Sequence, residues 1–194
     1  MDRRGGRRRR IRPRLGRDAE PGTYPLILIL VDEEGHAVLG PLPLGEVTVE
    51  GMERLLEPPP TAYAVGVSLG DQVELLGYDL EPESPAPGDR VTLTLYWRAL
   101  TEMETSYTVF VHLLGAEGEI AAQHDGVPAT GTYPTPLWVA REVVADPHPL
   151  DLPSDLPPGT YSLEIGMYVV ETGARLAVSG SPDGAIRLQL SIQP

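Results

Sequence analysis

Residues 90–98, Arg-Val-Thr-Leu-Thr-Leu-Tyr-Trp-Arg, carry the clearest structural signal in the chain. Successive side chains of a β-strand point to opposite faces, so an apolar residue at every second position predicts a strand with one buried face. The apolar positions here are Val91, Leu93, Leu95 and Trp97. The stretch therefore predicts an antiparallel sheet that packs on a hydrophobic core.

Further short strands are predicted on both sides of this one, separated by turn residues. They cover residues 72–81, 107–114, 119–124, 142–152, 161–169 and 186–192. We expect residues 142–152 to be irregular, because Pro147 and Pro149 cannot donate ladder hydrogen bonds. No window shows helical periodicity. About seven strands in some 125 residues predict an all-β, immunoglobulin/fibronectin-III-like Greek-key β-sandwich.

A local motif supports this fold. Residues 156–161, Leu-Pro-Pro-Gly-Thr-Tyr, resemble the tyrosine corner of Greek-key sandwiches. In that motif the tyrosine hydroxyl bonds the backbone a few residues upstream. We therefore assign Tyr161, together with Trp97 in the core, a structural role.

The N-terminal quarter repeats part of this pattern. Residues 21–29, Pro-Gly-Thr-Tyr-Pro-Leu-Ile-Leu-Ile, align with residues 158–166, Pro-Gly-Thr-Tyr-Ser-Leu-Glu-Ile-Gly. In both cases an acidic, glycine-containing turn and a second apolar segment follow. We interpret residues 21–50 as the last hairpin of a preceding, truncated repeat. Because an isolated hairpin is marginally stable, we expect it to dock on the main domain or on another chain, for example in a homodimer.

Four segments are predicted in total: an Arg-rich flexible tail (1–20), the orphan hairpin (21–50), a Pro-rich linker (51–70) and the sandwich (71–194). The linker is placed by Pro58-Pro59-Pro60, which cannot occupy a helix interior.

Charge and composition exclude several functions. The net charge is −13 although nine of the fifteen arginines lie within the first seventeen residues, so the rest of the chain should repel nucleic acid and anionic lipid. The absence of cysteine excludes disulfides and thiolate chemistry. The longest apolar run, Leu26 to Val31, is too short to insert into a membrane.

Several stretches resemble a known domain. They are residues 70–79 (Gly-Asp-Gln-Val-Glu-Leu-Leu-Gly-Tyr-Asp), 87–89 (Pro-Gly-Asp), 93–97 (Leu-Thr-Leu-Tyr-Trp), 107–114 (Tyr-Thr-Val-Phe-Val-His-Leu-Leu), 123–126 (Gln-His-Asp-Gly) and 131–135 (Gly-Thr-Tyr-Pro-Thr). Together they resemble an uncharacterised β-sandwich domain of Chloroflexi-type bacterial proteins, which often follows glycosyltransferase-like membrane segments. The resemblance covers roughly residues 68–192 and implies an extracytoplasmic accessory role without established catalytic residues.

Candidate ligand-binding residues are the aromatics Tyr133, Trp138, Tyr96 and Tyr168, since sugar rings stack on exposed aromatic side chains. Trp138 has an alternative role as a plug at the open end of the core. His112 and His124 are the candidate metal ligands, because a hairpin that turns at Glu117-Gly118 is expected to place them diagonally on one face, with Asp125 following. Two imidazoles without a third ligand favour hydrogen-bonded structural roles instead.

The sequence therefore predicts a non-enzymatic accessory or interaction domain that presents a rigid surface to a glycan or a protein, without a cofactor. Two alternatives stay open at this stage. One is a hydrolase with a dispersed carboxylate pair. The other is a protease-inhibitor-like module that projects residues 126–138 as an extended loop.

Overall fold

The computed structural model describes residues 19–51 and 53–194, so nearly all of the predicted Arg-rich tail lies outside the described residues. The chain divides into two compact units, residues 1–53 and 54–194, which we describe separately. Apart from one short 3-10 turn, the regular elements of the described residues are all strands. No helix in these ranges has the length and hydrophobicity needed to cross a bilayer.

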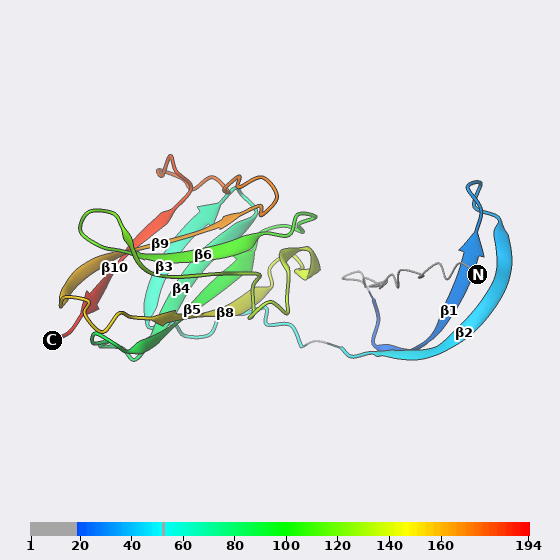
Figure 1. Ribbon diagram of the computed structural model, residues 1–194, viewed down its shortest axis with the longest axis horizontal. Coiled ribbons are helices and arrows are strands. Elements are labelled where there is room, and N and C mark those ends of the chain that lie inside the picture. Colours follow the sequence, from blue (N-terminus) through cyan, green and yellow to red (C-terminus); the bar gives the residue numbers. More distant parts are fainter. Residues whose placement is uncertain (1–18, 52) are drawn as a thin grey trace, which may run out of the picture. The chain divides into compact units, whose positions relative to one another are not determined.

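The first unit contains an antiparallel hairpin of β1 (Gly22–Val31) and β2 (Ala37–Val49), drawn in blue in Figure 1 as a curved ribbon. Its turn is closed by the Asp32 carboxylate, which accepts hydrogen bonds from the amides of Glu34 and His36 at 3.0 and 2.9 Å. A side chain that bonds its own turn in this way favours the reversal. The predicted hairpin is therefore present.

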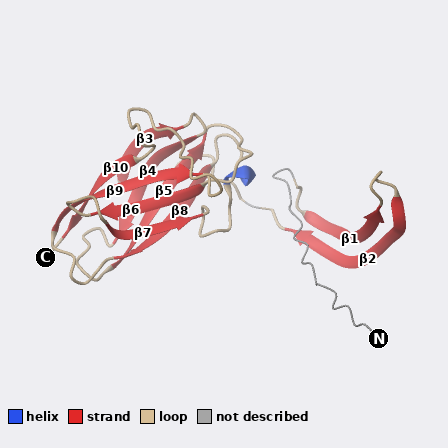
Figure 2. Ribbon diagram, turned by 45° about the horizontal axis from the view of Figure 1, so that its top comes forward, coloured by secondary structure: helices blue, strands red, loops and turns tan. Residues whose placement is uncertain are grey.

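The second unit contains two four-stranded antiparallel sheets (Figures 1 and 2). Sheet I has the order β3-β4-β5-β8 and sheet II the order β10-β9-β6-β7. The strands of sheet I are β3 (Tyr63–Leu69), β4 (Val73–Glu81), β5 (Arg90–Ala99) and β8 (Val143–Asp151). Those of sheet II are β6 (Thr108–Leu114), β7 (Ile120–Gly126), β9 (Gly159–Tyr168) and β10 (Ile186–Ile192).

The two sheets share one hydrophobic core. Val91, Leu93, Leu95 and Trp97 of β5 are fully buried, as the alternating pattern predicts. They belong to the same cluster as the inward-facing residues of sheet II, Val109, Val111, Leu113, Leu163, Ile165 and Met167. The predicted all-β, sandwich-like architecture is thus confirmed, with eight strands in place of about seven.

The additional strand lies where we predicted a linker. Residues 63–69 form β3 at the edge of sheet I, so the prediction of a linker over residues 51–70 is wrong for its last third. The register of β3 against β4 shifts between Ala64 and Val67, around Gly66, whose φ is +71°. Such a bulge interrupts the period of two that identifies a strand in sequence.

Strand β8 forms the opposite edge of sheet I. Pro147 and Pro149 pair with Thr94 and Thr92 of β5 and lie in a strand with no second neighbour among the described strands. Edge strands tolerate proline, and proline in turn discourages pairing with another chain. The segment is thus regular, contrary to our expectation.

The predicted tyrosine corner is formed. The Tyr161 hydroxyl donates a 2.7 Å hydrogen bond to the carbonyl of Pro157, four residues upstream. The bond fixes the chain where it enters β9.

Candidate functional site

A cluster of polar and aromatic side chains lies on the outer face of sheet II. In β6 the core-facing residues alternate with Phe110 and His112, which therefore point outward. Register places His112 between Gln123 of β7 and Glu164 of β9. Side chains from three neighbouring strands consequently meet around one point of the sheet.

Asp125 is the centre of this cluster. Its Oδ1 lies 3.0 Å from His112 Nε2, and its Oδ2 accepts a 3.2 Å hydrogen bond from the Tyr168 hydroxyl. The Asp125 side chain remains 33% exposed, so its carboxylate keeps lone pairs that face solvent. Burial raises the pKa of the Tyr168 phenol, and the Asp125 charge raises it further. The phenol therefore stays protonated and donates.

The Phe110 ring lies beside His112 and Tyr168 on the same face of sheet II. Its ring is 1% exposed although it points away from the core, because the Arg175 guanidinium covers it at 4.3 Å from the ring centroid. The ring centroids of His112 and Tyr168 lie 5.1 and 6.2 Å from that of Phe110. We call His112, Asp125, Tyr168, Phe110 and Arg175 the Asp125 face.

A second ion-paired group flanks the Asp125 face. Arg187 of β10 donates to Glu164 at 2.6 Å and also bonds Asp183. These contacts lower the pKa of the Asp183 carboxyl well below its ordinary range, chiefly through the hydrogen bond from Arg187. The charge of Arg187 is therefore engaged by carboxylates of its own chain.

The four aromatic candidates do not come together. Trp138 is fully buried and Tyr133 is 6% exposed, so the prediction that they stack on a ligand is wrong. Trp138 Nε1 donates to the Tyr133 carbonyl at 3.0 Å, and both side chains belong to the hydrophobic core. Tyr96 lies on sheet I, where its hydroxyl donates to Asp79 at 2.8 Å. Only Tyr168 belongs to the Asp125 face.

The loop that carries Tyr133 and Trp138 is anchored rather than extended. It includes a 3-10 turn at Thr135–Leu137, and Thr135 is fully buried. The Tyr133 hydroxyl donates to Glu142, whose carboxylate also accepts a 2.7 Å bond from Arg54. Burial, followed by the Glu142 hydrogen bond, raises the pKa of Tyr133 to about 12. These anchors disfavour the extended inhibitory loop considered from the sequence.

The two histidines predicted to share a face lie on opposite faces of sheet II. His112 pairs with Gln123, whereas His124 pairs with Val111, whose side chain is in the core. The β6–β7 pairing shifts by one residue between Leu113 and Leu114, next to the turn, which reverses the direction of His124 relative to His112. The described residues contain no group of three or more side chains able to hold a metal ion.

His124 instead takes part in a buried chain of polar side chains between the sheets. Its Nδ1 lies 2.8 Å from Nδ1 of His148, and His148 Nε2 lies 2.8 Å from Asp146. Asp146 also accepts a 3.2 Å hydrogen bond from the Trp97 indole. Sequence reasoning missed Asp146 and His148, although both share the core-facing parity of Val144 and Leu150 in β8.

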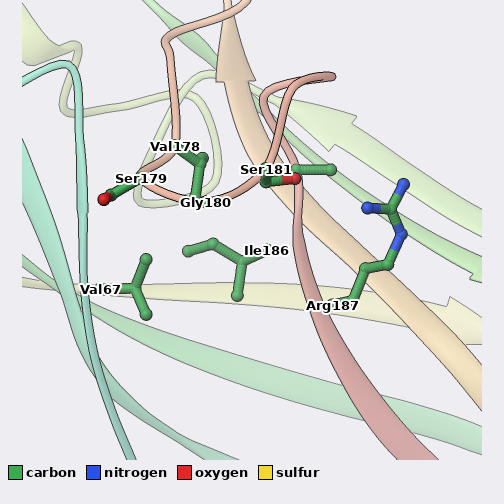
Figure 3. Close-up of a pocket in the computed structure, with 8 residues that line it drawn as sticks. Val67, Val178, Ser179, Gly180, Ser181, Ile186 and Arg187 are labelled. Carbon is green, nitrogen blue, oxygen red and sulfur yellow. The ribbon is translucent and has the colours of Figure 1, made fainter.

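A shallow hollow of about 280 Å³ lies between the edges of the sheets. It is lined by Val67 of β3, by Val178 of the connection between β9 and β10, and by Ile186 of β10. In Figure 3 these three face one another, while the Arg187 side chain extends away from them. Ser179, Ser181 and Arg187 also line the hollow, so its surface is of mixed polarity, and the Arg187 charge is engaged by Glu164 and Asp183. No protein-family model matches the chain, and no curated protein is significantly similar to it.

Proposed function

We propose that this chain is a non-enzymatic binding domain of the immunoglobulin/fibronectin-III-like class and that its Asp125 face binds the hydroxyl groups of a glycan. The observation that carries the proposal is the fixed orientation of the Asp125 carboxylate, which His112 and Tyr168 hold from two neighbouring strands. A carboxylate held in this way accepts hydrogen bonds from sugar hydroxyls without losing further side-chain freedom.

The surroundings of Asp125 support the same proposal. The half-buried ring of Tyr168 lies beside the carboxylate and offers an apolar edge to the C–H groups of a sugar. The group lies on the outer face of a sheet, and the neighbouring Glu164 carboxylate is held by Arg187, which favours binding over glycoside hydrolysis by a pair of carboxylates. The resemblance noted from the sequence adds an extracytoplasmic accessory role to the proposal.

Charge narrows the ligand class. The protein has a net charge of −13, and Asp125 is itself anionic. Uronic acids and sulfated sugars would be repelled, so neutral hexose or N-acetylhexosamine chains are the expected ligands.

The experiment is calorimetric titration of the full chain with neutral, N-acetylated and uronic-acid oligosaccharides. We expect binding to a neutral or N-acetylated probe, and a loss of at least about tenfold in affinity for Asp125→Asn, which keeps the shape and removes the charge. Tyr96→Phe on sheet I is the matched control and should leave affinity unchanged. No heat with any probe at millimolar concentration, or equal affinity for Asp125→Asn, would contradict the proposal.

A further inference from the structure

The β1–β2 hairpin repeats the structure of β9–β10 and not only its sequence. The Tyr24 hydroxyl donates a 2.9 Å hydrogen bond to the carbonyl of Glu20, four residues upstream. The Tyr161 hydroxyl makes the same bond to Pro157. The hairpin therefore carries a formed tyrosine corner, which in the complete sandwich marks the entry into the penultimate strand.

The strand register also agrees from Gly22 to Leu26, beyond which the β1–β2 pairing has three shifts that the β9–β10 pairing lacks. Gly22 pairs with Val49 and Tyr24 with Val47, just as Gly159 pairs with Ile192 and Tyr161 with Leu190. Register determines which side chains share a face. In the alignment of the two strands, Leu26, Leu28 and Leu30 of β1 correspond to Leu163, Ile165 and Met167 of β9.

These equivalent positions differ sharply in burial. Leu163, Ile165 and Met167 are fully buried against sheet I, whereas Leu26 and Leu30 are 40% and 48% exposed. Strand β9 pairs on both edges, with β10 and β6, whereas among the described strands β1 pairs with β2 alone. The hairpin therefore has the apolar face and the free edge of a strand pair that belongs to a larger sandwich.

We propose that β1–β2 is the closing hairpin of a second β-sandwich and that its partner is a domain of the same class that lacks its last two strands. In that assembly β1 pairs with the partner's equivalent of β6, and Leu26, Leu28 and Leu30 enter the partner's core. Backbone pairing supplies affinity and the alternate side chains supply specificity, as in other cases of strand donation.

A second copy of this chain does not fit as the partner. In this chain the acceptor position is filled by β9 and β10 themselves. In addition, β1 has Ile29 where β9 has Gly166, and a Cβ at Gly166 would lie 2.6 Å from the Phe110 ring and 2.7 Å from the Gly184 carbonyl. The partner therefore carries a small side chain at the position of Phe110.

The outward residues of β1 define the partner further. Ile27, Ile29 and Val31 replace Glu164, Gly166 and Tyr168 of β9, and they are 50%, 44% and 58% exposed. The neighbouring strand of the partner is therefore expected to carry apolar or small outward side chains, in contrast to His112 of this chain.

The first test uses the full chain as the donor and residues 54–158 of this sequence, without β9 and β10, as the acceptor probe. Two probes are refolded with the full chain, one with Phe110 and one with Phe110→Ala, and complexes are measured by size-exclusion chromatography with light scattering. We expect a one-to-one complex with the Phe110→Ala probe and at least about tenfold weaker binding to the Phe110 probe.

Two donor variants control this test. Leu28→Asp places a charge on the inward face of β1 and should abolish the complex. Thr48→Asp places the same charge on the other face of the hairpin and should retain it. Equal binding of both probes would contradict the requirement for a small residue at the position of Phe110. A dimer of the full chain alone, disrupted by Leu28→Asp, would overturn the proposal in favour of exchange between copies. A peptide of residues 159–194, which carries the probe's own missing strands, is the positive control. If this peptide assembles with the probes and the full chain does not, the proposal is overturned.

A second test does not depend on the probe folding. In the full chain, the double substitution Ile165→Leu and Met167→Leu makes the inward residues of β9 identical to those of β1. We expect this variant to shift the Tm by less than about 5 °C. Gly166→Ile gives β9 the outward residue of β1 and should lower the Tm by more than about 8 °C. Loss of folding in the first variant, or tolerance of the second, would contradict the equivalence on which the proposal rests.

Discussion

His124 and His148 face each other between the edge strands β7 and β8, with their Nδ1 atoms 2.8 Å apart. One ring must donate and the other accept, so the bond is lost when both rings are fully protonated. Burial lowers the pKa of His124, and the neighbouring His148 lowers it further, while Asp146 and Asp125 act in the opposite direction. The pair thus connects the two sheets through an interaction that depends on pH.

The first prediction is a loss of stability in mild acid. Because the pKa of His124 is lower in the folded protein than its ordinary value of 6.5, the unfolded chain binds more protons below about pH 6.5. The free energy of unfolding should therefore fall as the pH decreases from 7 to 5, by at most about 1.4 kcal/mol per pH unit for this group. Urea denaturation at each pH measures the effect.

Matched variants assign this pH dependence. His124→Gln cannot be protonated and should flatten the slope, although it also lowers stability at pH 7. His36→Gln, in the exposed turn of the hairpin, should leave the slope as in the parent. Equal slopes in the parent and His124→Gln would show that the pair does not control acid stability.

The second prediction concerns the tyrosine corner. Tyr161→Phe removes the 2.7 Å hydrogen bond to Pro157 and should lower the free energy of unfolding of the sandwich by about 1 kcal/mol. Tyr24→Phe removes the equivalent bond of the hairpin and should leave the sandwich transition unchanged, because Tyr24 belongs to the other compact unit. Thermal unfolding followed by near-ultraviolet circular dichroism separates the two cases. A neutral Tyr161→Phe would mean that the corner does not contribute to stability.

The strands that sequence predicts well are those whose alternation is uninterrupted. In β5 every second residue is apolar, and the same residues are buried. β3 was missed because a bulge at Gly66 breaks the alternation and proline-rich residues precede it. The corner was predicted because it depends on residues that are adjacent in the chain.

The candidate site was less predictable, because it depends on register. One residue of difference in the β6–β7 pairing places His112 and His124 on opposite faces. Asp125 and Tyr168 lie 43 positions apart in the chain. They come together because their strands, β7 and β9, both pair with β6 in sheet II. An aromatic residue in sequence also gives no measure of its burial, which is why Trp138 was considered for ligand binding although it is fully buried.

The third prediction follows from the burial of both tryptophans. Trp97 and Trp138 are each 0% exposed, and each indole donates a hydrogen bond inside the protein, to Asp146 and to the Tyr133 carbonyl. Their fluorescence should be quenched by acrylamide several times less in the native protein than in 6 M guanidinium chloride. Addition of the oligosaccharide that binds should leave this emission unchanged, since the Asp125 face contains no tryptophan. Strong quenching of the native protein would contradict the placement of Trp138.

The fourth prediction concerns the ion pair that anchors the start of the second unit. Arg54 donates to Glu142 at 2.7 Å and to the Tyr133 hydroxyl at 2.6 Å, and the Glu142 side chain is only 3% exposed. Removal of one partner of a buried pair leaves an uncompensated charge, which costs about 3–5 kcal/mol when both groups are buried. Because the Arg54 side chain is 28% exposed, we expect Arg54→Ala to lower the free energy of unfolding by about 2 kcal/mol.

A double-mutant cycle separates the ion pair from the packing around it. In the parent protein the Val139 amide donates a 2.9 Å hydrogen bond to the Glu142 carboxylate. Glu142→Gln removes the charge but keeps an oxygen that can accept this bond. In the Glu142→Gln background, Arg54→Ala should therefore cost less than in the parent, by at least about 1 kcal/mol. Equal costs in the two backgrounds would mean that Arg54 acts through contacts other than the ion pair, such as those with Tyr133 and the Leu137 carbonyl.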